Sequence, residues 1–131
     1  MGEKALVESL VTDAVNLIKK LDEIATSPTF VAWYYYDDAD EWRLLVASPI
    51  LDPLLQRQEA VAYRKVIEAL SSIAPAALSI SDLKLVSTTY QLLQALKFLV
   101  RTGPLGIARM HFKSLTMNGI FISEVIILRS A

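Results

Sequence analysis

The sequence predicts an α+β fold in a single domain, residues 1–131, with helices packed on one face of a five-stranded, mostly antiparallel sheet. Two observations lead to this prediction. Three segments are rich in apolar residues that recur at three- and four-residue intervals, which is typical of helices that bury a side. Two other segments each hold a pair of apolar runs joined by turn residues, which is typical of β-hairpins. With one further short strand, the predicted order is α-β-β-α-β-α-β-β.

The first helix is predicted over residues 3–25 and ends at Ser27-Pro28. Its apolar residues form a wide stripe, and its polar residues, Asp13 among them, are expected to face solvent. The first hairpin follows, with strands at 29–36 and 42–48. In its predicted register Tyr36 lies opposite Glu41, Tyr35 opposite Trp42 and Tyr34 opposite Arg43. One side of the hairpin is then continuously apolar (Val31, Trp33, Tyr35, Trp42, Leu44 and Val46) and the other is mixed.

The acidic run at residues 37–41 joins these two strands and raises the question of a metal site. A calcium loop needs glycine at its sixth place and glutamate at its twelfth. Counted from Asp38, those places hold Arg43 and Pro49. We therefore interpret the run as a solvated turn, since aspartate favours turns through local hydrogen bonds to the backbone. We expect neither a metal nor a cofactor.

The middle of the chain is predicted to hold two more helices and one strand. Asp52-Pro53 begins a helix that runs to about Ser72, because aspartate caps a helix and proline suits its first position. A short strand is expected over 82–87. The third helix, 89–101, ends at Gly103-Pro104 and is nearly apolar all round, so we expect it to be buried on two sides.

The last predicted element is a second hairpin around Asn118-Gly119, a strong signal for a two-residue turn. Its final strand has apolar residues on both faces, so it needs a second cover beyond the predicted helices. The expected register pairs Met117 with Ile120, Leu115 with Ile122 and Lys113 with Glu124.

Composition favours self-association. Hydrophobic residues make up 53% of the 131 residues and the mean hydropathy is +0.40, which is high for a small lone globule. Our leading hypothesis is therefore a non-enzymatic protein-interaction module that forms a homodimer and can also take another protein partner. We expect its interface on the surplus apolar side of the third helix or on the terminal hairpin, at Ile120, Ile122, Ile126 and Leu128.

Several classes of partner are not expected. The net charge of −1 and the lack of a basic patch argue against nucleic acid. No run reaches the ~18 apolar residues of a membrane span. The absence of cysteine suits a reducing compartment, so we expect a cytoplasmic protein.

Two alternatives remain open. The mixed side of the first hairpin, with Tyr34, Tyr36 and Arg43, suits a small-molecule site in a cleft between the sheet and its helices. The triplet Asp82-Leu83-Lys84 matches the acid-x-Lys pattern of metal-dependent nucleases, with Asp40, Glu41 or Asp52 as the distant acid. Such a short pattern arises often by chance.

The single histidine, His111, is predicted on the second hairpin on the same face as Arg109, Lys113 and Glu124. This cluster suits anion binding or acid–base chemistry. No second metal ligand or nucleophile is evident beside it, so we interpret it as the polar part of a sheet face. The same face is expected to carry Leu115, Ile122, Ile126 and Leu128.

Overall fold

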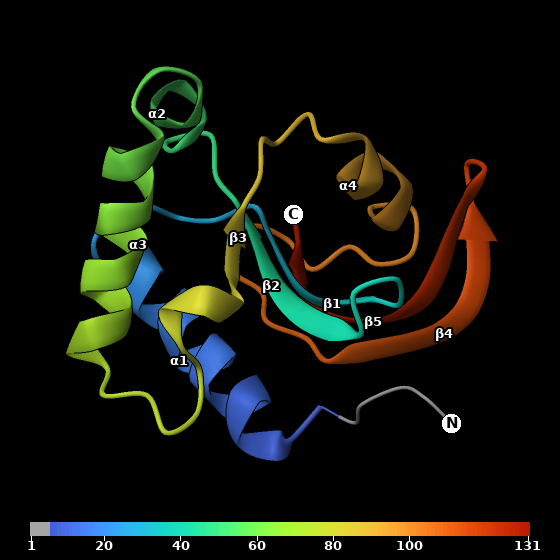
Figure 1. The fold of residues 1–131 in the computed structure, drawn as a ribbon. Coiled ribbons are helices and arrows are strands. Elements are labelled where there is room, and N and C mark those ends of the chain that lie inside the picture. Colours follow the sequence, from blue (N-terminus) through green and yellow to red (C-terminus); the bar gives the residue numbers. More distant parts are fainter. Residues whose placement is uncertain (1–5) are drawn as a thin grey trace.

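The computed structural model describes residues 6–131 and confirms the α+β class and the predicted order of elements (Figure 1). The five strands form one sheet in the order β3-β2-β1-β5-β4. The pairs β2–β1, β1–β5 and β5–β4 are antiparallel, and β3 runs parallel to β2. The position of the short third strand was open from the sequence, and the structure pairs it with the first hairpin.

The first half of the chain follows the predicted pattern. Helix α1 spans Glu8–Glu23, and the predicted helical positions 3–5 lie outside the described residues. Strands β1 (Phe30–Tyr36) and β2 (Glu41–Ala47) have the predicted register, with Tyr36 opposite Glu41. Asp13 corrects one expectation, because it is buried and does not face solvent.

The predicted helix over 52–72 is two helices, α2 (Asp52–Arg57) and α3 (Glu59–Ser72). The break falls at Gln58, whose backbone leaves the helical region at φ −143° and ψ 65°. No proline or glycine marks this position. The two halves differ in packing, since α2 has no buried residues while α3 buries Ala62, Val66, Ala69 and Leu70. The break thus separates a surface helix from a core helix.

A short 3₁₀ turn, Ile80–Asp82, precedes strand β3, which covers Leu83–Leu85. Helix α4 is shorter than predicted, at Gln91–Leu96, because the chain then tightens into three-residue turns. Leu99 N donates to Leu96 O, for example. Figure 1 shows α4 on the opposite side of the sheet from α1 and α3. The expectation that all helices pack on one face is therefore wrong for α4.

The sheet separates two apolar cores. The first core packs α1 and α3 against one face of the strands and contains both tryptophans. The second core packs α4 against the other face and includes Phe30, Leu45, Leu93 and Leu96. The apolar character of α4 and of both faces of β5 explains this arrangement, since each needs a cover on two sides.

The second hairpin, β4 (Met110–Met117) and β5 (Ile120–Ser130), has the predicted register, with Lys113 opposite Glu124. The faces on which its side chains lie differ from the prediction. Leu115 and Ile122 pack in the second core, whereas Ile126 and Leu128 pack in the first. The strands thus change face near Ser114, which has a positive φ of 52°. The expected single face of His111, Leu115, Ile122, Ile126 and Leu128 does not exist.

Arg129 ties three distant parts of the chain together. Its fully buried guanidinium makes a two-pronged ion pair with Asp22 at 2.8 and 2.9 Å. It also donates to Gly106 O at 2.9 Å and to Pro28 O at 3.2 Å. The end of α1, the β1 entry and the loop before β4 are therefore held by one side chain.

Candidate functional site

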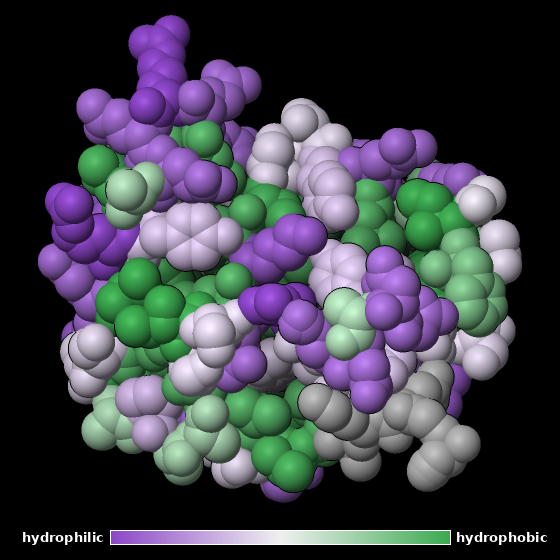
Figure 2. Space-filling model, in the orientation of Figure 1, coloured by the Kyte–Doolittle hydropathy of each residue, from purple (hydrophilic) through white to green (hydrophobic). Residues whose placement is uncertain are grey.

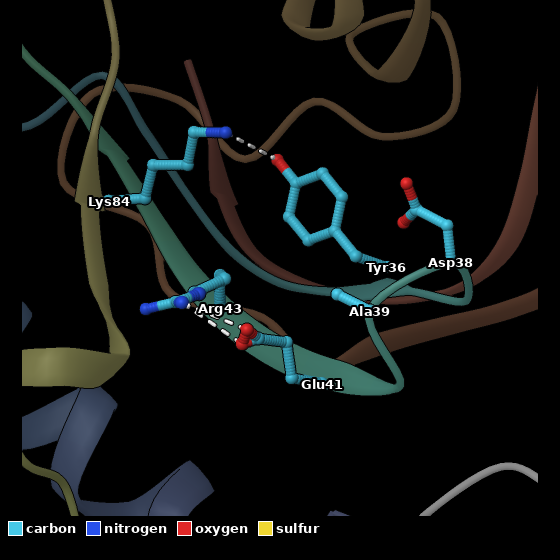
Figure 3. A pocket seen from close by; sticks show the side chains of 6 residues that line it. All are labelled: Tyr36, Asp38, Ala39, Glu41, Arg43 and Lys84. Atoms are coloured by element: carbon cyan, nitrogen blue, oxygen red, sulfur yellow. Dashed lines mark hydrogen bonds and ion pairs between the residues drawn. The ribbon is translucent and has the colours of Figure 1, made fainter.

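A small pocket lies where the β1–β2 turn approaches β3 (Figure 3). Its volume is about 210 Å³ and its lining is Tyr36, Asp38, Ala39, Glu41, Arg43 and Lys84. Hairpin register places Tyr36 and Arg43 on the same side of the sheet, as predicted. Parallel pairing of β3 with β2 then brings Lys84 beside them, opposite Leu45.

Arg43 and Glu41 form the base of the pocket. The guanidinium Nη2 lies 2.9 Å from each carboxylate oxygen of Glu41, and Arg43 also donates to the carbonyl oxygen of Ser81. The guanidinium is thus held at two nitrogens, Nη2 by the Glu41 carboxylate and Nη1 by the Ser81 carbonyl. The cation over an aromatic ring is Lys84, 4.8 Å from the centre of the Tyr36 ring.

Tyr36 forms the wall of the pocket. Its hydroxyl accepts a hydrogen bond from Lys84 Nζ at 3.3 Å. Burial raises its pKa, while a hydrogen bond with Tyr90 and the charge of Arg43 act in the opposite direction. The ring therefore stays a neutral phenol at ordinary pH.

Tyr34, the third residue predicted for this site, does not line the pocket. It is buried in the second core, and its ring packs edge-on against Tyr36 with 4.8 Å between ring centres. Burial and the neighbouring Tyr36 raise its pKa to about 12. Its role is to support the Tyr36 ring from behind.

Sequence reasoning missed Lys84 and Asp38 as pocket residues. Asp38 lies in the turn and was assigned only to solvation. Lys84 was considered only within the acid-x-Lys pattern. The outward position of Lys84 on an alternating strand was a usable signal, but the neighbour of that strand was not known.

The acids of the predicted nuclease site make separate contacts that stabilise the fold. Asp82 accepts from Ser79 N at 2.9 Å and so caps the 3₁₀ turn. Asp52 accepts from Thr88 N at 3.0 Å, and Asp40 accepts from the hydroxyl of Tyr35. Among residues 6–131, no group of three or more histidine, aspartate or glutamate side chains is placed to hold a metal ion.

His111 and Glu124 meet on the second hairpin, as their predicted shared face implied. His111 Nε2 lies 2.5 Å from Glu124 Oε2, and Lys113 Nζ lies 3.9 Å from the same oxygen. The carboxylate is buried, whereas the imidazole is half exposed. Arg109 pairs instead with Glu8 of α1 at 2.6 and 2.9 Å. The His111–Glu124 contact thus links β4 to β5.

The predicted interface residues lie inside the molecule. Ile122, Ile126 and Leu128 are buried in the two cores, and Ile120 is partly buried against the second. They pack within their own chain, with Ile122 in the second core under α4 and Ile126 and Leu128 in the first core.

Exposed apolar side chains concentrate elsewhere. Nine large ones are exposed in the described chain, and four of them, Phe98, Leu105, Ile107 and Met110, fall within residues 98–110. We call these four residues the 98–110 patch. Ile107 and Met110 line a groove of about 370 Å³ between the end of α4 and the start of β4. On the face shown in Figure 2, apolar residues form several separate areas among polar ones.

No protein-family model, curated protein or solved structure matches this chain. None of the helices described in residues 6–131 is both long and apolar enough to cross a membrane. The candidate sites are therefore argued from their own geometry.

Proposed function

We propose that this protein is a non-enzymatic interaction module that self-associates through the 98–110 patch. The observation that carries the proposal is the concentration of four of the nine exposed large apolar residues in this one segment. Phe98 and Leu105 are the two most exposed of the nine, at 72% and 73%. Apolar groups gathered at such exposure are typical of contact surfaces.

The neighbouring strand supports a second copy as the occupant. Met110 of the patch is the first residue of β4, and β4 is an edge of the sheet. An edge strand has unpaired backbone groups along its outer side. Antiparallel pairing of β4 with β4 of another copy satisfies these groups around a twofold axis, the commonest symmetry of dimers. The patch would then be covered at the end of the joined strands.

Charge also suits a second copy. Residues 98–110 contain only Arg101 and Arg109 as charged residues, and Arg109 is paired with Glu8. Two copies therefore meet with little like-charge repulsion. We further propose a cytoplasmic location, which a chain without cysteine suits. Another protein with an exposed strand is the competing occupant.

Analytical ultracentrifugation tests the proposal. The wild-type chain is expected to sediment as a dimer at micromolar concentration. The variant Phe98→Glu/Leu105→Glu is expected to weaken dimerisation by about a hundredfold or more, since it would place unpaired charge in an apolar contact.

The matched control is Ile50→Glu/Ile80→Glu, which changes two residues that are each 55% exposed and lie outside the patch. It should dimerise like the wild type. Circular dichroism confirms that all three proteins fold. A monomeric wild type, or equal weakening in both variants, would overturn the proposal.

A further inference from the structure

We infer that the pocket between the β1–β2 turn and β3 binds a small zwitterion, a molecule that carries an amine and a carboxylate on one short chain. This inference goes beyond self-association and rests on other residues. It uses the pocket lined by Tyr36, Asp38, Glu41, Arg43 and Lys84.

Size limits the ligand. The pocket has a volume of about 210 Å³. Pockets for drug-sized ligands begin near ~300 Å³. The pocket therefore suits a group of amino-acid size.

Two of the four charged residues in the lining neutralise each other. Arg43 Nη2 lies 2.9 Å from both carboxylate oxygens of Glu41, and the Ser81 carbonyl accepts another hydrogen bond from Arg43. This pair keeps its charges within the base of the pocket. It gives the site shape but little net field.

The other two charged residues, Lys84 and Asp38, form no salt bridge with any residue from 6 to 131. Lys84 Nζ uses one donor on the Tyr36 hydroxyl at 3.3 Å and stays 4.8 Å from the ring centre. An ammonium group has three donors, so Lys84 keeps donors for a ligand. Asp38 is exposed on the turn and keeps its carboxylate oxygens as acceptors.

The two opposite charges flank one aromatic ring. Figure 3 shows Lys84 at the hydroxyl end of Tyr36 and Asp38 on the other side of the ring. A simple anion that is attracted by Lys84 is repelled by Asp38. A simple cation that is attracted by Asp38 is repelled by Lys84. A zwitterion satisfies both, with its carboxylate at Lys84, its amine at Asp38 and its carbon chain on the Tyr36 ring.

Titration of the ¹⁵N-labelled protein by NMR tests this inference. The probes are glycine, β-alanine and 4-aminobutyrate, whose charges lie at increasing separation. Acetate and methylammonium carry one charge each. We expect a saturable shift at Tyr36 and Ala39 with at least one zwitterion, and at least about tenfold weaker binding of both single-charge probes. Equal binding of acetate or methylammonium, or no saturable shift with any zwitterion, would overturn the inference.

Two variants test whether each of the two charged residues binds one end of the zwitterion. Lys84→Met and Asp38→Asn each remove one charge and are expected to weaken binding about tenfold or more. Asp37→Asn is the matched control, because Asp37 is the neighbouring acid of the turn and does not line the pocket. Loss of binding in the control to the same extent would contradict a specific site. Phe98→Glu/Leu105→Glu should bind like the wild type, so failure of self-association leaves this test intact.

Discussion

A buried carboxylate joins α1 to the segment that leads into β3. Asp13 accepts hydrogen bonds from the backbone nitrogens of Ala76, Ala77 and Leu78 at 3.1, 2.7 and 2.9 Å. Burial raises the pKa of Asp13, and the three hydrogen bonds lower it by more, so its pKa lies below the ordinary 3.8. The folded protein therefore favours the charged carboxylate more than the unfolded chain does.

We predict that Asp13→Asn lowers the free energy of unfolding at neutral pH by about 1–3 kcal/mol, because an amide has one acceptor oxygen for three backbone donors. A depressed pKa gives stability that is complete above the unfolded-state value and lost as pH falls through the folded-state value. In urea denaturation the difference between wild type and variant should therefore hold from neutral pH down to the unfolded-state pKa of 3.8 and shrink as pH falls further. A difference that stays constant or grows would contradict this assignment.

Sequence patterns predicted some individual residues and missed others for a common reason. Tyr36 and Arg43 were placed together correctly, because the hairpin register follows from local turn residues. Asp13 was wrongly placed in solvent, and Lys84 was not assigned to the pocket. Their partners lie more than forty residues away in the chain, and spacing within one segment carries no information about such partners.

For whole elements too, features set by local residues were predicted and features set by distant contacts were missed. Both hairpins have their predicted registers, since each turn fixes its own strands. The break at Gln58 and the side of the sheet that α4 covers depend on packing between distant elements. Propensity alone continues a helix through Gln58, because no breaker is present. Tertiary contacts override it by burying α3 and leaving α2 at the surface.

The loop before β4 and the turn after it contain glycines with different requirements. Gly119 has a φ of 77° in the open Asn118-Gly119 turn, where an added Cβ meets no atom within 4 Å. An added Cβ at Gly106 would lie 2.0 Å from the backbone oxygen of Thr102. Arg129 also holds the Gly106 carbonyl, which restricts any shift of that loop.

We therefore predict that Gly119→Ala costs about 1 kcal/mol of stability, through left-handed backbone strain alone. Gly106→Ala should cost about 3 kcal/mol, because backbone must move to relieve the overlap. Thermal unfolding of both variants measures the difference. A larger loss in Gly119→Ala than in Gly106→Ala would show that the loop yields more easily than its contacts indicate.

At the scale of the whole molecule, the two cores contain many of the apolar side chains that give the chain its high mean hydropathy. The first lies under α1 and α3, and the second lies under α4. The second core takes up the side chains of β5 that composition had assigned to an interface. Average hydropathy reports how much apolar surface a chain has, but not which element covers it. The proposal of self-association consequently rests on the 98–110 patch and on the position of β4 as an edge strand.

The two cores lie on opposite faces of the same sheet, so we predict that they unfold together. Both tryptophans, Trp33 and Trp42, lie in the first core, while Leu96 is fully buried in the second. Leu96→Ala removes buried apolar volume and should cost about 2–5 kcal/mol. In a two-state domain this loss shifts the tryptophan fluorescence transition and the circular dichroism transition equally, although Leu96 packs on the opposite face from both tryptophans.

Leu17→Ala in the first core is the matched variant and should shift both signals in the same way. If Leu96→Ala moves the dichroism transition and leaves fluorescence unchanged, α4 and its core unfold separately from the α1–α3 side of the sheet.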